Sequence, residues 1–205
     1  QYLFHSQHGL IDERAIREAV LRVGAAECET LYVHSAISFG LPNRTLGRSR
    51  ILKILGDILI ELNVKTLCMP TFTFSFCNGV DFDVLETRTP MGALNEHFRT
   101  RSNVVRSADP LMSVALLGSE RSLVDDLGVQ SVGKDSTFDR LSQLDDVKFL
   151  FLGTTLGDCF TYMHYLEWKA DVPYRYNRTF GGRVRTPEGV RQMEQELFVR
   201  YHGVE

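Results

Sequence analysis

One histidine in the 205-residue sequence stands beside an acidic residue at a spacing that suits proton transfer. His164 and Glu167 form a His-x-x-Glu pattern, and on a helix two residues three positions apart lie on the same face. A neutral imidazole can accept a proton from an attacking amine, and a nearby carboxylate stabilises the imidazolium that results. Surface ion pairs often produce the same spacing, so the pattern alone indicates a catalytic base only weakly.

Metal chemistry is disfavoured by the cysteines and by the other histidines. A zinc enzyme would show His-Glu-x-x-His and a di-iron protein a second acidic motif, and the sequence contains neither. The cysteines lack a C-x-x-C spacing, which is typical of reduced thiols, and most of the other histidines lie near the chain ends or follow Glu96. We therefore expect no metal. The residues in question are Cys28, Cys68, Cys77 and Cys159, and His5, His8, His97 and His202.

Clusters of small hydroxyl residues follow the first two predicted strands. Strand ends beside helix N-termini place backbone N–H groups and hydroxyls where a phosphate or a carbonyl oxygen can be held. His34 ends the first of these strands, a position from which α/β proteins often contact ligands. Ordinary turns are also rich in Ser and Thr, so both interpretations stay open. The clusters are Ser35 and Ser38, then Thr71, Thr73 and Ser75.

A basic loop with a glycine precedes the second predicted helix. Its sequence, Arg44-Thr-Leu-Gly47-Arg-Ser49, is similar to the Arg/Gln-x-x-Gly-x-Gly/Ala loop with which GNAT acetyltransferases grip the pyrophosphate of CoA, but it ends in serine. Helix N-termini favour such anions. A single partial motif is weak, so a charged loop that caps the helix is the stronger interpretation.

Hydrophobic patterning predicts helices that alternate with strands. This alternation indicates an α/β or α+β fold, with three layers and a central mixed sheet flanked by helices. Because the chain shows no repeat and no low-complexity linker, we expect one continuous domain over 1–205. The predicted helices are 12–23, 51–62, 92–99 and a last one that begins at 158 or 161 and ends at 170; the predicted strands are 30–35, 66–70, 113–117 and 148–152.

Composition favours a small-molecule partner. The net charge is only −3, which gives no reason to expect binding to nucleic acid or to an acidic membrane surface. The longest apolar runs, such as Ile51–Leu62, are too short or too interrupted to span a bilayer. No basic-then-apolar leader is found, although the chain starts at Gln1, so a cytoplasmic protein is expected. A homo-oligomer is compatible with the sequence.

The order of these pieces along the chain resembles the aminoglycoside 3-N-acetyltransferase family, which uses acetyl-CoA but lacks the GNAT fold. The resemblance covers most of the chain, from about Ile16 to Phe180, and rests on segments that follow one another in the family's order. The segments are Leu31–Ser38, Leu67–Thr73, Met91–Arg99, Arg106–Gly118, Asp135–Leu141, Phe151–Gly153 and Thr161–Glu167.

The resemblance implies an acetyl-CoA-dependent N-acetyltransferase and assigns roles to several residues. His164 matches the family's catalytic histidine, and Glu167 matches the acidic residue of the same motif. Thr71 or Thr73 is the candidate for holding the thioester oxygen as it becomes an oxyanion. Transfer would be direct, within a ternary complex, so the cysteines need no role. The residues expected to line the acetyl-CoA channel are His34, Ser35, Ser38, Thr73, Arg106, Ser107 and Ser113.

The acceptor is expected to be an amino sugar, often nucleotide-linked. The segment 172–180 resembles members that acetylate amino sugars of surface polysaccharides, and Arg175 and Arg178 would suit phosphates. An aminoglycoside is the alternative, for which Asp81, Asp83, Glu86, Asp125 and Asp126 would supply an acidic cleft. A protein that binds CoA or a nucleotide without catalysis is the alternative of another class.

Two differences from the family bear on this acceptor site. Asp109-Pro110 stands where the family commonly has His-Pro, which affects the acceptor contacts or the shape of the channel. The family's chains are also usually longer, so the C-terminal part of the acceptor site can lie outside these 205 residues.

Overall fold

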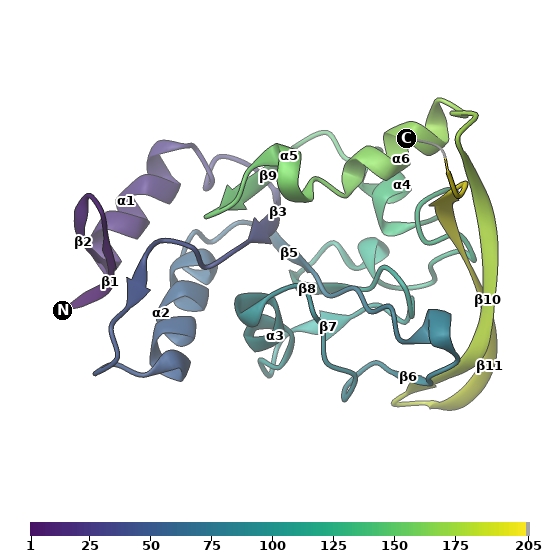
Figure 1. Ribbon diagram of the computed structural model, residues 1–205, viewed down its shortest axis with the longest axis horizontal. Helices are drawn as coiled ribbons and strands as arrows, with labels where there is room; N and C mark the ends of the chain where they lie inside the picture. The colour runs from purple at the N-terminus through teal and green to yellow at the C-terminus, as the bar shows by residue number, and fades with distance from the viewer. Residues whose placement is uncertain (204–205) are drawn as a thin grey trace.

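A mixed sheet of five strands forms the centre of the computed structural model, which describes residues 1–203 (Figure 1). In sheet order the strands are β7 (Val105–Arg106), β8 (Val114–Gly118), β5 (Thr66–Pro70), β3 (Thr30–Ser35) and β9 (Val147–Leu152). β3 pairs in parallel with β5 and with β9, whereas β8 is antiparallel to β5 and β7. His34 is in register with Phe151, so the carboxyl ends of β3 and β9 lie side by side.

Helices cover both faces of this sheet. On one face α1 (Glu13–Arg22), α2 (Arg48–Ile60) and α3 (Ala93–Arg99) bury an aliphatic cluster against the inward side chains of β3 and β5. On the other face α4 (Thr137–Leu141) and α6 (Tyr162–Lys169) pack over an aromatic cluster that includes Tyr32, Phe72 and Phe138. The short helix α5 (Leu156–Cys159) joins β9 to α6. The three-layer arrangement predicted from the sequence is therefore present.

Two smaller sheets flank the central one. β1 (Tyr2–Ser6) pairs with β2 (Gly9–Asp12) and with β4 (Leu41–Pro42). β10 (Arg175–Thr186) and β11 (Gly189–Arg200) form a long antiparallel hairpin, and β10 also pairs in parallel with β6 (Phe82–Asp83). Figure 1 shows this hairpin standing along one end of the molecule. Two 3-10 helices, Phe76–Asn78 and Arg121–Leu123, complete the elements of residues 1–203.

Most elements expected from the sequence are found near their predicted positions. The predicted cap of the first helix is present, since the carboxylate of Asp12 accepts a hydrogen bond from Ala15 N at 2.9 Å. Of the two starts predicted for the last helix, the one at residue 161 is confirmed, because α6 follows its N-cap Thr161 and ends at the C-cap Ala170. The start at Asp158 is wrong, because Asp158 lies in the separate helix α5 and the chain turns at Phe160. The hairpin of β1 and β2 and the long hairpin of β10 and β11 were not predicted. Among residues 1–203, no helix has both the length and the apolar character that crossing a bilayer requires.

Candidate active site

The helix α6 places His164 and Glu167 together, as their spacing predicts. His164 Nδ1 lies 2.9 Å from Glu167 Oε2, and the imidazole side chain is 37% exposed. The opposite side of α6 is anchored to α4, because Tyr165 is buried and its hydroxyl donates a hydrogen bond to Asp139 Oδ1 at 2.9 Å. A neutral His164 that donates from Nδ1 to the carboxylate presents Nε2 as its acceptor nitrogen. The pair therefore has the arrangement of a general base and the group that orients it.

Glu167 is held in turn by the beginning of the long hairpin. Tyr174 Oη donates to Glu167 Oε1 at 3.0 Å, and Arg175 Nε lies 2.9 Å from Oε2. Burial by itself raises the pKa of the Glu167 carboxyl, but hydrogen bonds from His164 and Tyr174 and the charge of Arg175 outweigh it, so the pKa is lowered. The carboxylate is therefore ionised at neutral pH and stabilises an imidazolium at His164.

The lowered pKa of Glu167 predicts a pH-dependent contribution to stability. A carboxylate with a lowered folded-state pKa stabilises the protein above its ordinary pKa of 4.5, and this contribution is lost as the pH falls through the folded value. Glu167→Gln should therefore be less stable than the native chain at pH 7, and the gap should close in acid. Urea denaturation at several pH values measures it. Glu194→Gln, on an exposed position of β11, is the matched control and should show no such gap. A pH-independent gap for Glu167→Gln would contradict the expectation.

His34 lies at the end of β3 beneath a group of aromatic rings. Its side chain is only 3% exposed, and its ring stacks on Phe151 at 5.3 Å and meets the edge of Phe160 at 6.5 Å. Within the described residues, Nε2 of His34 is buried without a hydrogen-bond partner. Burial lowers the pKa of His34 to about 4, so the ring is neutral at physiological pH. His34 is therefore a buried, neutral imidazole at the end of β3, and its role in the acetyl-CoA channel stays a prediction.

The turn after β3 is tied to its neighbours by the two serines singled out in the sequence. Ser35 Oγ donates to Asn95 Oδ1 of α3 at 2.7 Å, and Ser38 Oγ donates to the carbonyl of Gly153 at 2.6 Å. Gly153 has φ of 72°, and a Cβ there would come within 2.1 Å of Ala36 O, so only glycine allows the two strand ends to approach this closely. The turn is a firmly positioned surface beside His34.

The other five predicted channel and oxyanion residues come together in the interior instead. Thr71 Oγ1 donates to Ser113 O at 3.0 Å, and Arg106 Nε donates to Thr71 Oγ1 at 3.2 Å and to Ser113 Oγ at 3.1 Å. Thr73 Oγ1 donates to Pro110 O, and Ser107 Oγ accepts from Val114 N. All four hydroxyl residues are buried, so their hydroxyls are used within the protein. These hydrogen bonds join β5, β7 and β8. The channel and oxyanion roles expected for Thr71, Thr73, Arg106, Ser107 and Ser113 stay predictions.

Asp109, the residue that differs from the family's usual histidine, also faces inward. Its Oδ1 accepts hydrogen bonds from Leu111 N at 2.8 Å, Met112 N at 3.0 Å and Ser131 Oγ at 2.9 Å. Burial raises the pKa of the carboxyl, opposed by these hydrogen bonds. Asp109 therefore closes a turn between β7 and β8, with one edge on a cavity of about 300 Å³.

A cavity of about 510 Å³ opens beside the turn after β3, and it is called here the donor cavity because the sequence predicts that acetyl-CoA contacts this turn. Apolar side chains of β1 and α2, including Phe4 and Ile51, form its floor, and Ser35 lies at one end. Arg44 and Arg48 line it and are exposed. Gly47, with φ of 73°, stands directly before α2, so the first N–H groups of that helix lie at this cavity. The loop that the sequence suggested to be an ordinary cap thus forms the wall of a cavity.

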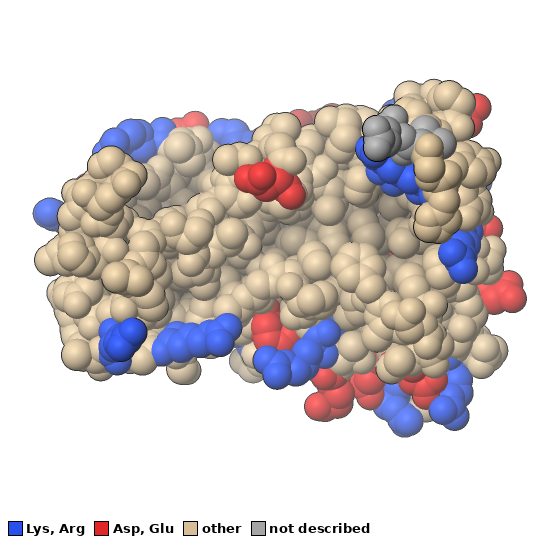
Figure 2. All heavy atoms as spheres, in the orientation of Figure 1, with Lys and Arg blue, Asp and Glu red and all other residues tan. Residues whose placement is uncertain are grey.

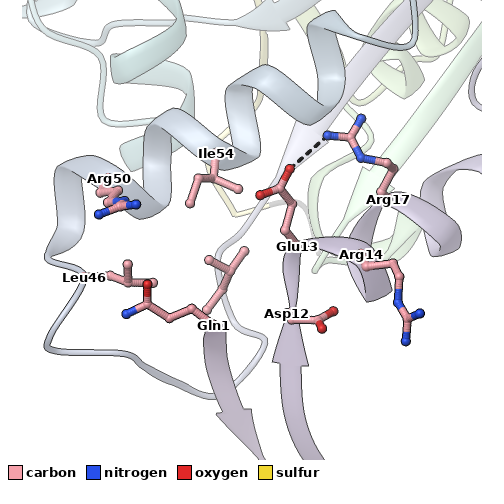
Figure 3. Close-up of a pocket in the computed structure, with 9 residues that line it drawn as sticks. Gln1, Asp12, Glu13, Arg14, Arg17, Leu46, Arg50 and Ile54 are labelled. Atoms are coloured by element: carbon pink, nitrogen blue, oxygen red, sulfur yellow. Dashed lines mark hydrogen bonds and ion pairs between the residues drawn. The ribbon is translucent and has the colours of Figure 1, made fainter.

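The face of the molecule drawn in Figure 2 is hollowed across its middle. Figure 2 shows a largely uncharged hollow across the middle of this face, with basic side chains along its lower rim in the region where α2 begins. Another cavity, of about 390 Å³, lies between β1, α1 and α2. Figure 3 shows that this second cavity holds the exposed Glu13–Arg17 ion pair, and none of its residues was predicted to act in the site. In the part of the chain that the structure describes, no group of three His, Cys, Asp or Glu side chains could hold a metal ion.

The architecture is that of the aminoglycoside acetyltransferase structures. "AAC-IIIb binary with CoASH" shares 22% sequence identity and a TM-score of 0.76, over 94% of this chain and 79% of that one. AAC(3)-Xa shares 21% identity and a TM-score of 0.75, over 93% of this chain and 73% of that one. YokD of Bacillus subtilis shares 20% identity and a TM-score of 0.72, over 92% of this chain and 82% of that one. These likenesses establish the fold.

The family follows from the sequence model of the aminoglycoside 3-N-acetyltransferases, which matches residues 62–202. This match covers most of the chain, and the chain belongs to the aminoglycoside 3-N-acetyltransferase family. It is therefore an N-acetyltransferase with acetyl-CoA as its cosubstrate. No curated protein sequence matches the chain significantly.

Proposed function

We propose that the chain transfers an acetyl group from acetyl-CoA to an amino group of an aminoglycoside, with His164 as the general base. The observation that carries this proposal is the hydrogen bond of 2.9 Å between His164 Nδ1 and Glu167 Oε2, in a chain of this family. A general base needs a free acceptor nitrogen and a group that stabilises its protonated form, and the pair supplies both.

His164 removes a proton from the amine while the acetyl group passes directly from CoA to that amine. The amine attacks the thioester carbonyl while His164 Nε2 accepts the proton that the amine loses. The new C–N bond forms as the C–S bond breaks, and the CoA thiolate takes the proton from the His164 imidazolium and leaves as the thiol, which restores the neutral base. Glu167 keeps the imidazole in the tautomer that offers Nε2 and stabilises its positive charge. Because Arg175 and Tyr174 hold Glu167, the imidazole is oriented before a substrate arrives.

The residues of the donor cavity fit acetyl-CoA. Two exposed arginines and the N-terminus of α2 suit a pyrophosphate, since both favour negative charge. The apolar floor of β1 and α2 suits the uncharged pantetheine arm. Ser35 and Ser38, predicted to contact the cosubstrate, lie on the turn between this cavity and the strand end of β9. The thioester of acetyl-CoA would then lie near the turn that carries Ser35 and Ser38, and it would supply the activated acetyl group there.

The aminoglycoside is favoured over a nucleotide-linked amino sugar as the acceptor. The family and the acetyltransferases of similar structure favour it, and AAC-VIa has been solved with sisomicin bound. Of the two arginines expected to bind a nucleotide's phosphates, Arg175 is engaged within the protein, because it contacts Glu167 and Phe198 O. Arg178 is exposed and lies over the Phe180 ring. Asp158 of α5, two residues before Phe160, is exposed and available to a cation.

A panel of amines tests the acceptor. We expect release of free CoA from acetyl-CoA in the presence of aminoglycosides. The kcat/KM for nucleotide-linked amino sugars should be lower, because their phosphates need free basic side chains to bind and a polycationic aminoglycoside does not. Thiol release with a chromogenic reagent measures it, and mass spectrometry locates the acetyl group. A higher kcat/KM for the nucleotide-linked sugars would contradict the aminoglycoside as acceptor and identify an amino sugar in its place. If the chain binds CoA but acetylates no amine, the proposed acetyl transfer is contradicted and the chain is a CoA-binding protein without catalysis.

A further inference from the structure

A second basic hollow adjoins the donor cavity on its outer side. This α2–α3 groove, of about 540 Å³, lies between the first turn of α2 and helix α3. It shares Arg48, Leu52, Gly92 and Ala93 with the donor cavity, so the two hollows are neighbours. Arg88 lies on its far wall, on the segment between β6 and α3. One ligand can therefore occupy both.

The charge of the groove is positive although an acidic residue lines it. Glu96 is bound by Arg99, whose Nε and Nη2 both donate to its carboxylate at 2.7 Å, and Thr89 N donates to it as well. Arg88 Nε stands 3.4 Å from Glu96 Oε1, and the Arg88 side chain is 84% exposed. Glu96 is thus neutralised without Arg88, and the guanidinium of Arg88 has donors to offer to another anion.

The remaining titratable groups leave Arg48 and Arg88 as the cations that face the groove. Burial, and then the charge of Arg101, lower the pKa of His97, so this ring is neutral at neutral pH. Arg101 itself donates to Asp57 Oδ1 at 2.6 Å, and Asp57 also accepts from Lys53. The free positive charge of the groove therefore comes from Arg48 of α2 and from Arg88 of the segment before α3.

We propose that Arg88, facing Arg48 across the α2–α3 groove, binds the 3′-phosphate of coenzyme A. The inference rests on the proposed donor site. Coenzyme A carries two separate anionic groups near its adenosine, the pyrophosphate and the ribose 3′-phosphate. The molecule offers two basic positions in two neighbouring hollows, the α2 N-terminus with Arg44 in the donor cavity and Arg88 in the α2–α3 groove. A guanidinium binds a phosphate monoester through paired charge-assisted hydrogen bonds.

The test compares CoA with 3′-dephospho-CoA, which lacks only that phosphate. Titration calorimetry on the full chain should show about tenfold tighter binding of CoA, the worth of one charge-assisted hydrogen-bonded contact. Arg88→Ala should lose this preference and bind both ligands as the native chain binds dephospho-CoA. Arg44→Ala should weaken both ligands by the same factor. Arg50→Ala, on α2 but at the other cavity, is the matched control and should keep the preference.

Several outcomes would overturn the inference. Equal binding of the two ligands by the native chain would show that no residue recognises the 3′-phosphate. A preference retained in Arg88→Ala would assign the recognition to other residues. Calorimetry needs no turnover, so a protein that binds CoA with the expected preference but acetylates nothing would refute acetyl transfer and leave the phosphate site intact. Absence of any CoA binding would refute the donor cavity and the phosphate site together.

Discussion

Alanine in place of His164 is expected to lower kcat for acetyl transfer by about 10²–10⁴-fold, which is the usual contribution of general base catalysis. The reason is that the amine must lose its proton as it attacks, and no other imidazole of residues 1–203 is hydrogen-bonded to a carboxylate. Affinity for CoA should be unchanged, because His164 lies on α6 and the donor cavity is formed by β1, α2 and the turn after β3. Steady-state kinetics and calorimetry measure the two quantities.

Two further variants make this experiment specific. His164→Gln should be as slow as His164→Ala although it can still contact Glu167, because an amide does not accept a proton at neutral pH. His8→Ala, at the exposed turn between β1 and β2, should have native activity and controls for loss of a histidine as such. Native turnover in either His164 variant would remove His164 as the base, and a parallel loss of CoA affinity would indicate a structural effect.

The pairing of His164 with Glu167 could be predicted from the sequence because it is local. His164 and Glu167 lie three residues apart, and a helix brings such residues together whatever surrounds it. What holds Glu167 could not be predicted, because Tyr174 and Arg175 reach it from the beginning of the long hairpin. In the sequence Arg175 appeared suited to a phosphate, since a charged side chain gives no sign of whether its partner belongs to the protein or to a ligand.

The central strands were predictable for a similar reason, and the hairpin was not. Thr30–Ser35 is a short run in which all but the last residue is buried, so its apolar character is visible. β10 is half exposed, carries several arginines and contains Gly181 and Gly182, which resemble a loop in sequence. Gly182 is in fact required by packing, because a Cβ there would lie 2.7 Å from the ring of Phe76. The pairing of β10 with the distant β6 leaves no local signal.

The Ser and Thr residues that follow strands gave the least information about which side chains line a cavity. Thr71 and Ser35 both end or follow a buried strand, yet Thr71 points into the interior and Ser35 lines the donor cavity. Sequence patterning distinguishes buried from exposed side chains only through hydrophobicity, and Thr and Ser are equally at home in either place when their hydroxyls have partners. The basic loop at Arg44–Arg48 was instead underestimated. Its incomplete motif favoured a simple helix cap, but the loop lines the donor cavity.

Arg106 is the residue whose replacement should cost the most stability. Its guanidinium donates to the carbonyls of Thr71, Thr87 and Val84 and to the hydroxyls of Thr71 and Ser113. Burial lowers the pKa of Arg106 to about 10, and the side chain also lies 4.8 Å from the centroid of the Phe82 ring. One side chain thereby connects β5 and β7 with the segment that follows β6.

Arg106→Met should lower the free energy of unfolding by about 2–4 kcal/mol, because several buried acceptors lose their donor at once and each unsatisfied group costs about 1–3 kcal/mol. Urea denaturation measures the loss. Arg183→Met removes an exposed ion pair with Asp81 and should cost no more than about 1 kcal/mol. Arg106→Lys should fall between the two, since an ammonium offers fewer donors in a less fixed geometry.

The same variants separate a structural role of Arg106 from the channel role that the sequence suggested. If Arg106 only supports the fold, the folded fraction of Arg106→Met should bind CoA with native affinity at a temperature where the protein remains folded. A loss of CoA affinity without a loss of stability would restore the channel role. Because Arg106 donates to Thr71 and Ser113 and not toward the donor cavity, the geometry favours the first result, and the site's electrostatics then depend on Arg44, Arg48 and Arg88.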